Sequence, residues 1–373
     1  MRVTAVALRD FRNYERADVA LAEGLTIVAG PNGAGKTNLL EGIYFGCAGR
    51  SPRTTSEREL VRHGAALTRV SVTTLDAEGD RHVIDVGFQP GEPKALSVDG
   101  APVNSLSTAP QRPLLSVFLP ERLELVKGSP GPRRAHLDHL VAALWPGRGE
   151  ARSSYARALA QRNALLGRIR AGSASPASLS TWDSELARHG IALMANRRAA
   201  AELLAPLFSA RASDLGLPRA TTITYRPRSA ATTAADLVAE LGERHGPDRD
   251  RGFTAHGPHR DDLRLLHGDR ALRSFGSQGQ QRVALLALLF AERDLLLAER
   301  GQAPFMLLDD VMSELDPTRR DLLASFVRSG GQALVTTTDV GHVPGSGASD
   351  VAVVEVDDGE TITPGVPAGR AAA

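Results

Sequence analysis

Apolar positions follow one pattern at both ends of the chain and another in the middle. Residues 1–120 and 250–373 contain short apolar runs separated by turn-forming residues, whereas residues 121–249 carry apolar side chains at the three-and-four spacing of helices. The runs Val3–Leu8 and Leu25–Ala29 predict strands, and the second is apolar throughout, as in a parallel sheet buried on both faces. We therefore expect a discontinuous α/β domain, interrupted by a mainly helical lobe.

Further elements follow from the same patterns and from their flanking turn signals. The predicted helices are Asn38–Phe45, Arg134–Leu144, Glu150–Ile169, Leu179 to Pro206 or beyond, and Gln280–Leu297. The predicted strands are residues 70–75 and 82–88 as a hairpin, 96–98, 305–308, 333–337 and 351–356. The helix from Gln280 is so apolar that it should be buried. The Gly-, Pro- and Ala-rich stretch after Gly359 is expected to be frayed.

A glycine-rich loop joins the second predicted strand to the first predicted helix. Its residues are Gly30, Pro31, Asn32, Gly33, Ala34, Gly35, Lys36 and Thr37. This strand–loop–helix order is typical of a phosphate-binding loop, where glycines let backbone N–H groups face a phosphate at a helix N-terminus. Lys36 would reach the terminal phosphates of ATP and the Thr37 hydroxyl would be a ligand of Mg²⁺. The chain has only three lysines against 41 arginines, so a lysine at this point is specific.

Composition limits the cellular compartments in which the protein is expected and suggests that its partner is an anion. Cys47 is the only cysteine, which excludes an intrachain disulfide. No apolar run is long enough for a membrane span and no signal peptide is recognisable, so a cytoplasmic protein is expected. The net charge is +1, but residues 127–170 alone carry about +7, counted from the nine basic and two acidic residues there. This basic window predicts either a DNA-phosphate surface or an ordinary solvated helix face.

Two further motifs complement the loop. Asp309 and Asp310 end an apolar strand, so they would lie at the ligand-binding edge of a parallel sheet. Asp309 would hold Mg²⁺, and Asp310 would orient or deprotonate the attacking water. Ser277, Gly279 and Gln280 begin the buried helix and offer a second phosphate-binding helix N-terminus, although such a sequence alone is more often only a helix cap.

Together these motifs resemble the ATP-binding-cassette (ABC) superfamily. The loop, the Ser277 segment, the two acids and Ser313–Asp316 stand in the order of Walker A, signature, Walker B and D-loop. The resemblance implies an ATP-driven, head-to-tail homodimer in which one copy's signature closes on the other copy's ATP. Two departures, Asp310 for the usual glutamate and Thr338 for the usual switch histidine, imply slow hydrolysis. The roughly 240 residues between loop and signature disfavour a transporter subunit.

The opening Phe11-Arg12-Asn13 is similar to that of the SMC-like DNA-repair ATPases, and Arg12 is the candidate nucleotide contact; an ordinary surface arginine is the alternative. Several longer stretches resemble the RecF family: Phe118–Glu121, Arg133–Asp138, Gln161–Asn163 and Ala255–Asp262. This implies an ABC-type ATPase head with a mixed sheet, an antiparallel patch and an inserted helical lobe.

The RecF resemblance also implies partners and a role. DNA, single-stranded or gapped, would be bound without sequence preference; RecR would be a partner, and recombinase loading and support of the SOS response would follow. An ABC-type subunit of another system, or a DNA-binding scaffold with little ATPase activity, are the alternatives. His256 and His259 could pass for metal ligands, but a tie between the two lobes is the preferred interpretation. Lys127 is either a phosphate contact or a solvated lysine.

Overall fold

The computed structural model describes residues 1–313 and 315–362 and divides the chain into two compact units. The first unit comprises residues 1–122 and 300–373, and the second comprises residues 123–299. Residues 250–299, expected from sequence in the ATPase lobe, belong by their contacts to the second unit. One reason is the pairing of the strand Asp262–His267, along its whole length, with Thr221–Arg226.

The first unit is built on two six-stranded sheets. The first sheet is antiparallel, in the order β2 (Tyr14–Ala20), β1 (Arg2–Phe11), β4 (Thr68–Leu75), β5 (Arg81–Phe88), β6 (Ala95–Val98) and β7 (Ala101–Pro102). The second runs in the order β15 (Glu360–Ile362), β14 (Val351–Asp357), β3 (Leu25–Ala29), β13 (Ala333–Thr337), β12 (Phe305–Leu308) and β8 (Leu115–Phe118). All its neighbouring pairs are parallel except β14–β15. The predicted hairpin and the predicted buried parallel strand are confirmed.

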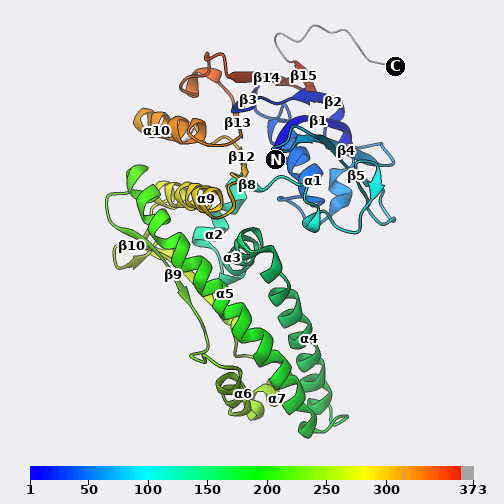
Figure 1. Cartoon of the computed structure of the whole chain (residues 1–373), viewed down its shortest axis with the longest axis vertical. Helices are drawn as coiled ribbons and strands as arrows, with labels where there is room; N and C mark the ends of the chain where they lie inside the picture. Colours follow the sequence, from blue (N-terminus) through cyan, green and yellow to red (C-terminus); the bar gives the residue numbers. More distant parts are fainter. Residues whose placement is uncertain (314, 363–373) are drawn as a thin grey trace. The chain divides into compact units, whose positions relative to one another are not determined.

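Helix α1 (Lys36–Ala48) packs on strands of both sheets (Figure 1). Its apolar residues join one core with those of β1, β3, β4 and β5. Two of its glycines allow close packing, since a Cβ at Gly42 or Gly46 would lie 2.7 or 2.5 Å from side-chain atoms of Leu8 or Val72. The remaining helical segments of this unit are α10 (Pro317–Arg328) and the short turns η1 (Glu57–Leu60), η2 (Leu106–Thr108) and η7 (Val340–His342).

The second unit is mainly helical, as predicted, with one small sheet. Its α-helices are α2 (Glu124–Lys127), α3 (Pro130–Leu144), α4 (Glu150–Arg170), α5 (Leu179–Asp214), α6 (Ala234–Gly242), α7 (His245–Arg251), α8 (Leu272–Phe275) and α9 (Gln278–Arg300). The sheet has the order β11 (Arg270–Ala271), β10 (Asp262–His267) and β9 (Thr221–Arg226). Short turns are η4 (Pro146–Arg148), η5 (Pro176–Ser178) and η6 (Pro258–Arg260), and η3 (Pro120–Leu123) spans the boundary between the units.

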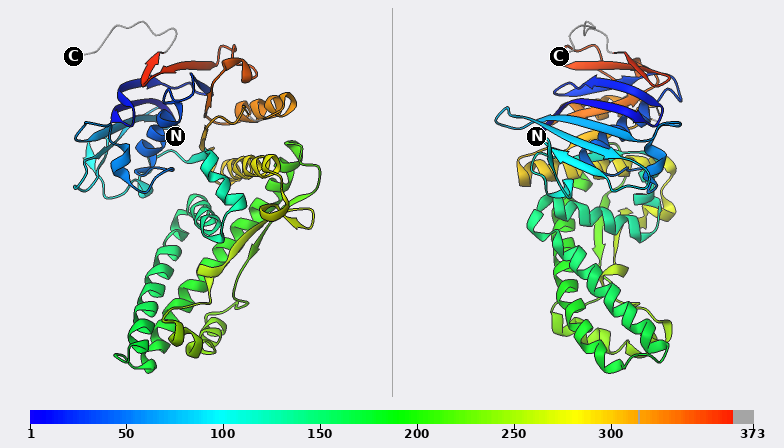
Figure 2. Two further views of the ribbon diagram at one scale, coloured as in Figure 1. Left: turned by 180° about the vertical axis from the view of Figure 1, so that it is seen from behind. Right: turned by 90° about the vertical axis from the view of Figure 1, so that its right-hand side faces the viewer.

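Helices α4 and α5 run side by side in both views of Figure 2. Helix α5 continues through Pro206 to Asp214. Helix α9 is buried from Val283 to Ala291, as its apolar sequence predicts. Strand β15 covers residues 360–362 of the stretch expected to be frayed, and residues 363–373 lie outside the described part. None of the described helices is long and apolar enough to cross a lipid bilayer.

A buried ion-pair cluster joins the C-terminal half of α4, the start of α5 and α7. The fully buried Arg162 guanidinium donates to Asp183 and to Asp248, both at 2.8 Å, and to the Thr254 hydroxyl at 2.7 Å. His245 lies 2.6 Å from the second oxygen of Asp183. Removing one member of such a cluster would leave uncompensated buried charge, so the cluster constrains which segments can pack here.

His259 makes the stability of the second unit depend on pH. Burial lowers the pKa of His259 to about 4, below the ordinary value of an unfolded histidine. As the pH falls, the histidine is therefore protonated in the unfolded chain before it is protonated in the folded one. The free energy of unfolding keeps its full value above about pH 6.5 and decreases between about pH 6.5 and pH 4, by up to about 3 kcal/mol. Urea unfolding at a series of pH values should show this loss, and His259→Gln should remove it. The exposed His63, changed to glutamine, should leave the profile intact.

Candidate nucleotide site

The loop Gly30–Thr37 lies at the carboxyl edge of the parallel sheet, between β3 and α1. Its tip, Pro31 to Gly33, is exposed. Gly33 and Gly35 have φ angles of 86° and 117°, a region that favours glycine. Gly35 precedes the first turn of α1, and no side chain caps that turn among the described residues. The N-terminal N–H groups of α1 are therefore available to an anion.

Several groups hold the loop from behind. The Tyr14 hydroxyl donates to Gly35 O at 3.0 Å, and the Asn13 amide donates to Ala34 O at 3.1 Å. Burial raises the pKa of the Tyr14 phenol, which keeps it protonated as a donor. Gly30 is needed for close approach, because a Cβ there would lie 2.1 Å from Val356 O. The carbonyl side of the loop is thus tied to the protein, which leaves its N–H side for a ligand.

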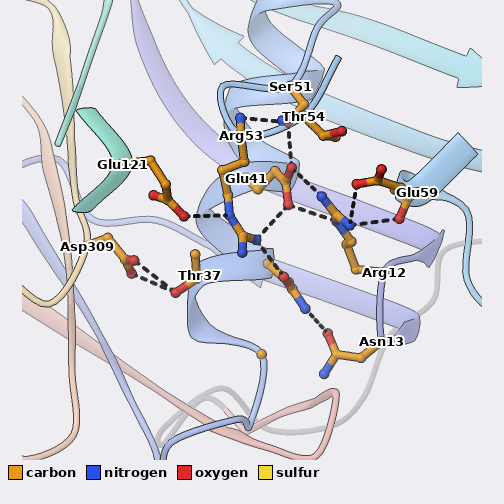
Figure 3. Close-up of polar contacts among 12 residues, drawn as sticks. Arg12, Asn13, Thr37, Glu41, Ser51, Arg53, Thr54, Glu59, Glu121 and Asp309 are labelled. Carbon is orange, nitrogen blue, oxygen red and sulfur yellow. Dashed lines mark hydrogen bonds and ion pairs between the residues drawn. The ribbon is translucent and has the colours of Figure 1, made fainter. Parts of the chain in front are cut away.

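Lys36 and Thr37 turn the end of the loop toward the two acids. The Lys36 ammonium donates to Gly30 O and Pro31 O, both at 2.8 Å, so its side chain lies along the loop. Burial lowers the pKa of Lys36, while the charges of Asp310 and Asp309 oppose that effect. The Thr37 hydroxyl donates to the Asp309 carboxylate, at 2.9 and 3.0 Å from its two oxygens (Figure 3). The predicted metal ligands Thr37 and Asp309 are therefore adjacent.

A threonine that the sequence analysis missed connects the two acids. The Thr336 hydroxyl donates to Asp309 at 2.7 Å and accepts the backbone N–H of Asp310 at 2.9 Å. Thr336 lies on β13, the strand between β3 and β12. Thr338, which stands where a switch histidine was expected, is exposed and makes none of these bonds. All five residues of β13 are buried, so no alternation along this strand marked Thr336 in the sequence.

The charges of the two acids act on each other and on Lys36. Burial, helped by the charge of Asp310, raises the pKa of the Asp309 carboxyl above its ordinary value. Asp310 has a positive φ of 47°, and its Oδ1 is buried with no hydrogen-bond partner among the described residues. Its other carboxylate oxygen accepts from Ser313 at 3.0 Å. The carboxylate oxygens of the two acids and the Thr37 hydroxyl fit a Mg²⁺ ion, which is a hard cation that prefers oxygen ligands.

Arg12 belongs to a charged cluster beside the loop and is not an ordinary surface arginine (Figure 3). Its guanidinium donates two bonds of 2.9 Å to Glu41, a fully buried residue of α1. Arg53 donates to Glu41 and to Asn38, both at 3.0 Å, and Ser51 also donates to Glu41. Sequence reasoning missed Glu41 and Arg53; a lone acid within an apolar helix was their only signal.

The predicted signature residues lie in the second unit. The Ser277 hydroxyl accepts the N–H of Gln280 at 3.2 Å, and the Gln280 side chain accepts the N–H of Ser277 at 2.9 Å. This is a reciprocal cap at the start of α9. Ser277 and Gly279 are exposed, and a Cβ at Gly279 would meet nothing within 4 Å. Of the expected D-loop, Asp316 caps α10, and Glu314 lies outside the described residues.

The histidines considered as metal ligands are used otherwise. His256 lies 2.5 Å from Glu240, and the Nε2 of His259 donates to Thr254 O at 3.0 Å. Among the described residues, no group of three or more His, Cys, Asp or Glu side chains is placed to hold a metal. Lys127 is half exposed and lies 3.9 Å from Glu124.

The family of the RecF/RecN/SMC N-terminal domain matches residues 2–361. The DNA replication and repair protein RecF of Anaeromyxobacter sp. is 40% identical over 370 residues, covering 96% of this chain and 98% of that protein. The chain belongs to the RecF family.

Solved structures agree on the fold. A structure of the recombination mediator protein RecF-ATPrS in the RecFOR pathway matches with a TM-score of 0.86 and 28% identity, covering 97% of this chain and 98% of that one. An SmcHead bound to the C-winged helix domain of ScpA matches with a TM-score of 0.57 at 16% identity, which supports the fold alone. The predicted ABC-type ATPase head is confirmed as the fold class of this RecF-family chain.

Glu41 should be more important for stability than other acids near Arg12. Glu41→Ala leaves two arginines without their buried partner, and we expect a loss of about 3 kcal/mol in the free energy of unfolding. Glu59 also approaches Arg12, at 3.9 Å, but is 55% exposed. Glu59→Ala is therefore the matched control, expected to cost less than about 1 kcal/mol. Equal losses for the two variants in urea unfolding would contradict this account of the cluster.

Proposed function

We propose that this RecF-family chain is an ATP-dependent DNA-binding protein of recombinational gap repair and replication-fork maintenance. The observation that carries the proposal is the joint placement of the Gly30–Thr37 loop, Asp309 and Asp310 at one sheet edge. Support comes from relatives described as DNA replication and repair proteins, and from matched structures described as RecF-ATP and RecF-ATPrS.

ATP binds with its phosphates in the loop. The N–H groups at the start of α1 surround the phosphates, and Lys36 leaves its carbonyl partners to contact the terminal ones. Thr37 and Asp309 would hold Mg²⁺, which would neutralise phosphate charge. Arg12, held in place by two bonds to Glu41, contacts the nucleotide.

Asp310 orients or deprotonates the attacking water. Its free Oδ1 is available for that contact, while Ser313 and the Thr336–backbone bond fix the rest of the residue. Because aspartate is one methylene shorter than glutamate, its carboxylate lies farther from the terminal phosphate, and hydrolysis is slow. The ATPase activity proposed from this arrangement is weak, and DNA binding stimulates it.

ATP also joins two copies of the chain. The exposed start of α9, with Ser277, Gly279 and Gln280, binds the terminal phosphate of the ATP held by the second copy. The resulting head-to-tail dimer closes on DNA, and slow hydrolysis releases it. RecR contact, recombinase loading and support of the SOS response are the family roles that this clamp would serve.

The segment 127–170 supplies part of the DNA-binding surface. Its net charge of about +7 overstates the number of arginines that are free to contact DNA. Arg133 and Arg162 are buried in ion pairs with Asp262 and with Asp183 and Asp248. Exposed arginines of α4, including Arg157 and Arg168, can contact phosphates. Such contacts bind DNA without reading its sequence.

A DNA-binding scaffold with little ATPase activity is the second candidate, favoured by the short side chain of Asp310. ATP hydrolysis measured with and without gapped DNA, beside ATP-dependent dimerisation, separates the two functions. Dimerisation without measurable turnover would favour the scaffold, and DNA-stimulated turnover would favour the clamp.

Lys36→Arg should keep the fold and weaken ATP-driven dimerisation. The planar guanidinium cannot occupy the compact position of the ammonium between the loop carbonyls and the phosphates. Light scattering with and without ATP should show dimers for the native chain and mostly monomers for the variant. Lys94→Arg, outside the loop, is the control and should dimerise normally. Unchanged dimer formation by the Lys36 variant would argue decisively against the assigned role.

DNA affinity should fall steeply with salt and should not depend on sequence. Phosphate contacts release counterions, so the logarithm of the binding constant falls linearly with the logarithm of salt concentration. Fluorescence anisotropy with several unrelated gapped duplexes, between about 50 and 200 mM salt, measures both properties. A salt-insensitive affinity would exclude a phosphate-tracking surface.

A further inference from the structure

Two segments that carry the RecF resemblance have no role in the nucleotide site. They are Arg133–Asp138 and Ala255–Asp262, and both lie in the second unit. Arg133 makes a two-bonded ion pair with Asp262, and the Arg134 guanidinium donates to Asp261 O at 2.8 Å. The start of α3 and the η6 turn are therefore held side by side.

A cavity of about 210 Å³ opens where these segments meet α4 and α5. Its polar lining is Arg134 and Asp138 of α3, Arg152 and Tyr155 of α4, Arg197 of α5, and His259 of η6. The rest of the wall is formed by Gly131, Ala135, Ala156, Leu159 and Leu193. The space suffices for a phosphate group and a few waters.

Most polar groups of the cavity already satisfy one another. Arg197 donates two bonds to Asp138, at 2.7 and 3.0 Å. Because the Nε2 of His259 donates to a backbone carbonyl, its Nδ1 accepts, and the Tyr155 hydroxyl donates to it at 2.8 Å. Arg134 and Arg152 are less fully engaged than these groups. Arg134 donates one hydrogen bond to Asp261 O. Arg152 has a half-exposed side chain and lies 3.5 Å from Asp138.

The cluster carries more positive than negative charge. Its members are Arg133, Arg134, Arg152, Arg197 and Arg260 against Asp138, Asp261 and Asp262. Burial, followed by the charge of Arg197, lowers the pKa of Arg134 from its ordinary value. Arginine stays protonated in proteins, so Arg134 keeps a positive charge that Asp261 and Asp262 offset only in part and that a bound anion would stabilise.

A neighbouring feature favours a nucleic acid over a peptide as the source of that anion. The positive charge of Arg260 contributes to lowering the pKa of both Arg134 and His259. Its guanidinium is 6.0 Å from the ring centre of Phe253, which is 42% exposed. An exposed aromatic ring beside guanidinium groups suits a base and its phosphate together.

We propose that this cavity binds one backbone phosphate of a DNA strand between Arg134 and Arg152. The planar forks of the two arginines match the oxygens of a phosphate. The proposal rests on the DNA binding proposed above and adds a defined contact to it.

The test compares two double variants with equal loss of charge. Arg134→Gln with Arg152→Gln removes the cavity donors. Arg188→Gln with Arg198→Gln removes two exposed arginines of α5 that do not line the cavity. Both are titrated with a fluorescent single strand and with a gapped duplex over a range of salt concentrations, and ATP binding and thermal unfolding are measured alongside.

The cavity variant should bind DNA about tenfold more weakly at about 0.1 M salt, with a log–log salt slope less steep by about one, and should keep ATP binding. The α5 variant should stay within about twofold of the native protein. Equal losses in both variants, or native affinity in the cavity variant, would overturn the inference; the second result would leave a peptide carboxylate as the candidate occupant. Thermal unfolding shows whether the glutamine variant still folds. If it does not, Arg134→Lys with Arg152→Lys, which keeps both positive charges, provides the test: this variant should recover part of the DNA affinity. If the native protein binds no DNA at all, the proposed function itself fails.

Discussion

The contact between Thr37 and Asp309 is the constraint on which the site depends. It joins residues 272 positions apart, and it forms only because β3, β13 and β12 lie next to one another with their carboxyl ends at one edge. Thr336, on the middle strand, fixes the acids relative to that edge. The loop from one end of the sequence and the acids from the other thus become one site through strand order.

Much of the first unit could be predicted from sequence. The apolar run 25–29 and the hairpin around Asp76–Asp80 have local signals, because burial on both faces and tight turns each select particular residues. Strand β9 could not be placed within the helical stretch, since its pairing with β10 is decided by residues about 40 positions away. The same non-local pairing moves residues 250–299 into the second unit.

The candidate site shows the same division between local and distant information. Gly30, Gly35 and Lys36 could be recognised because a phosphate loop needs them at fixed spacing. Tyr14 and Glu41 could not, because their importance comes from partners brought close by folding. A charge count from sequence is limited for the same reason. Arg133 and Arg162 add to the positive charge of the segment 127–170, yet in the fold their charge is neutralised by aspartates that are distant in the sequence.

The position of β3 has a consequence for how the chain is made. Both neighbours of this strand, β13 and β14, come from residues 333–357, and a carbonyl of Val356 packs directly against Gly30. During synthesis the loop therefore emerges from the ribosome long before the strands that hold it in shape. The nascent chain lacks the strands that complete the nucleotide site until residues 333–357 are translated.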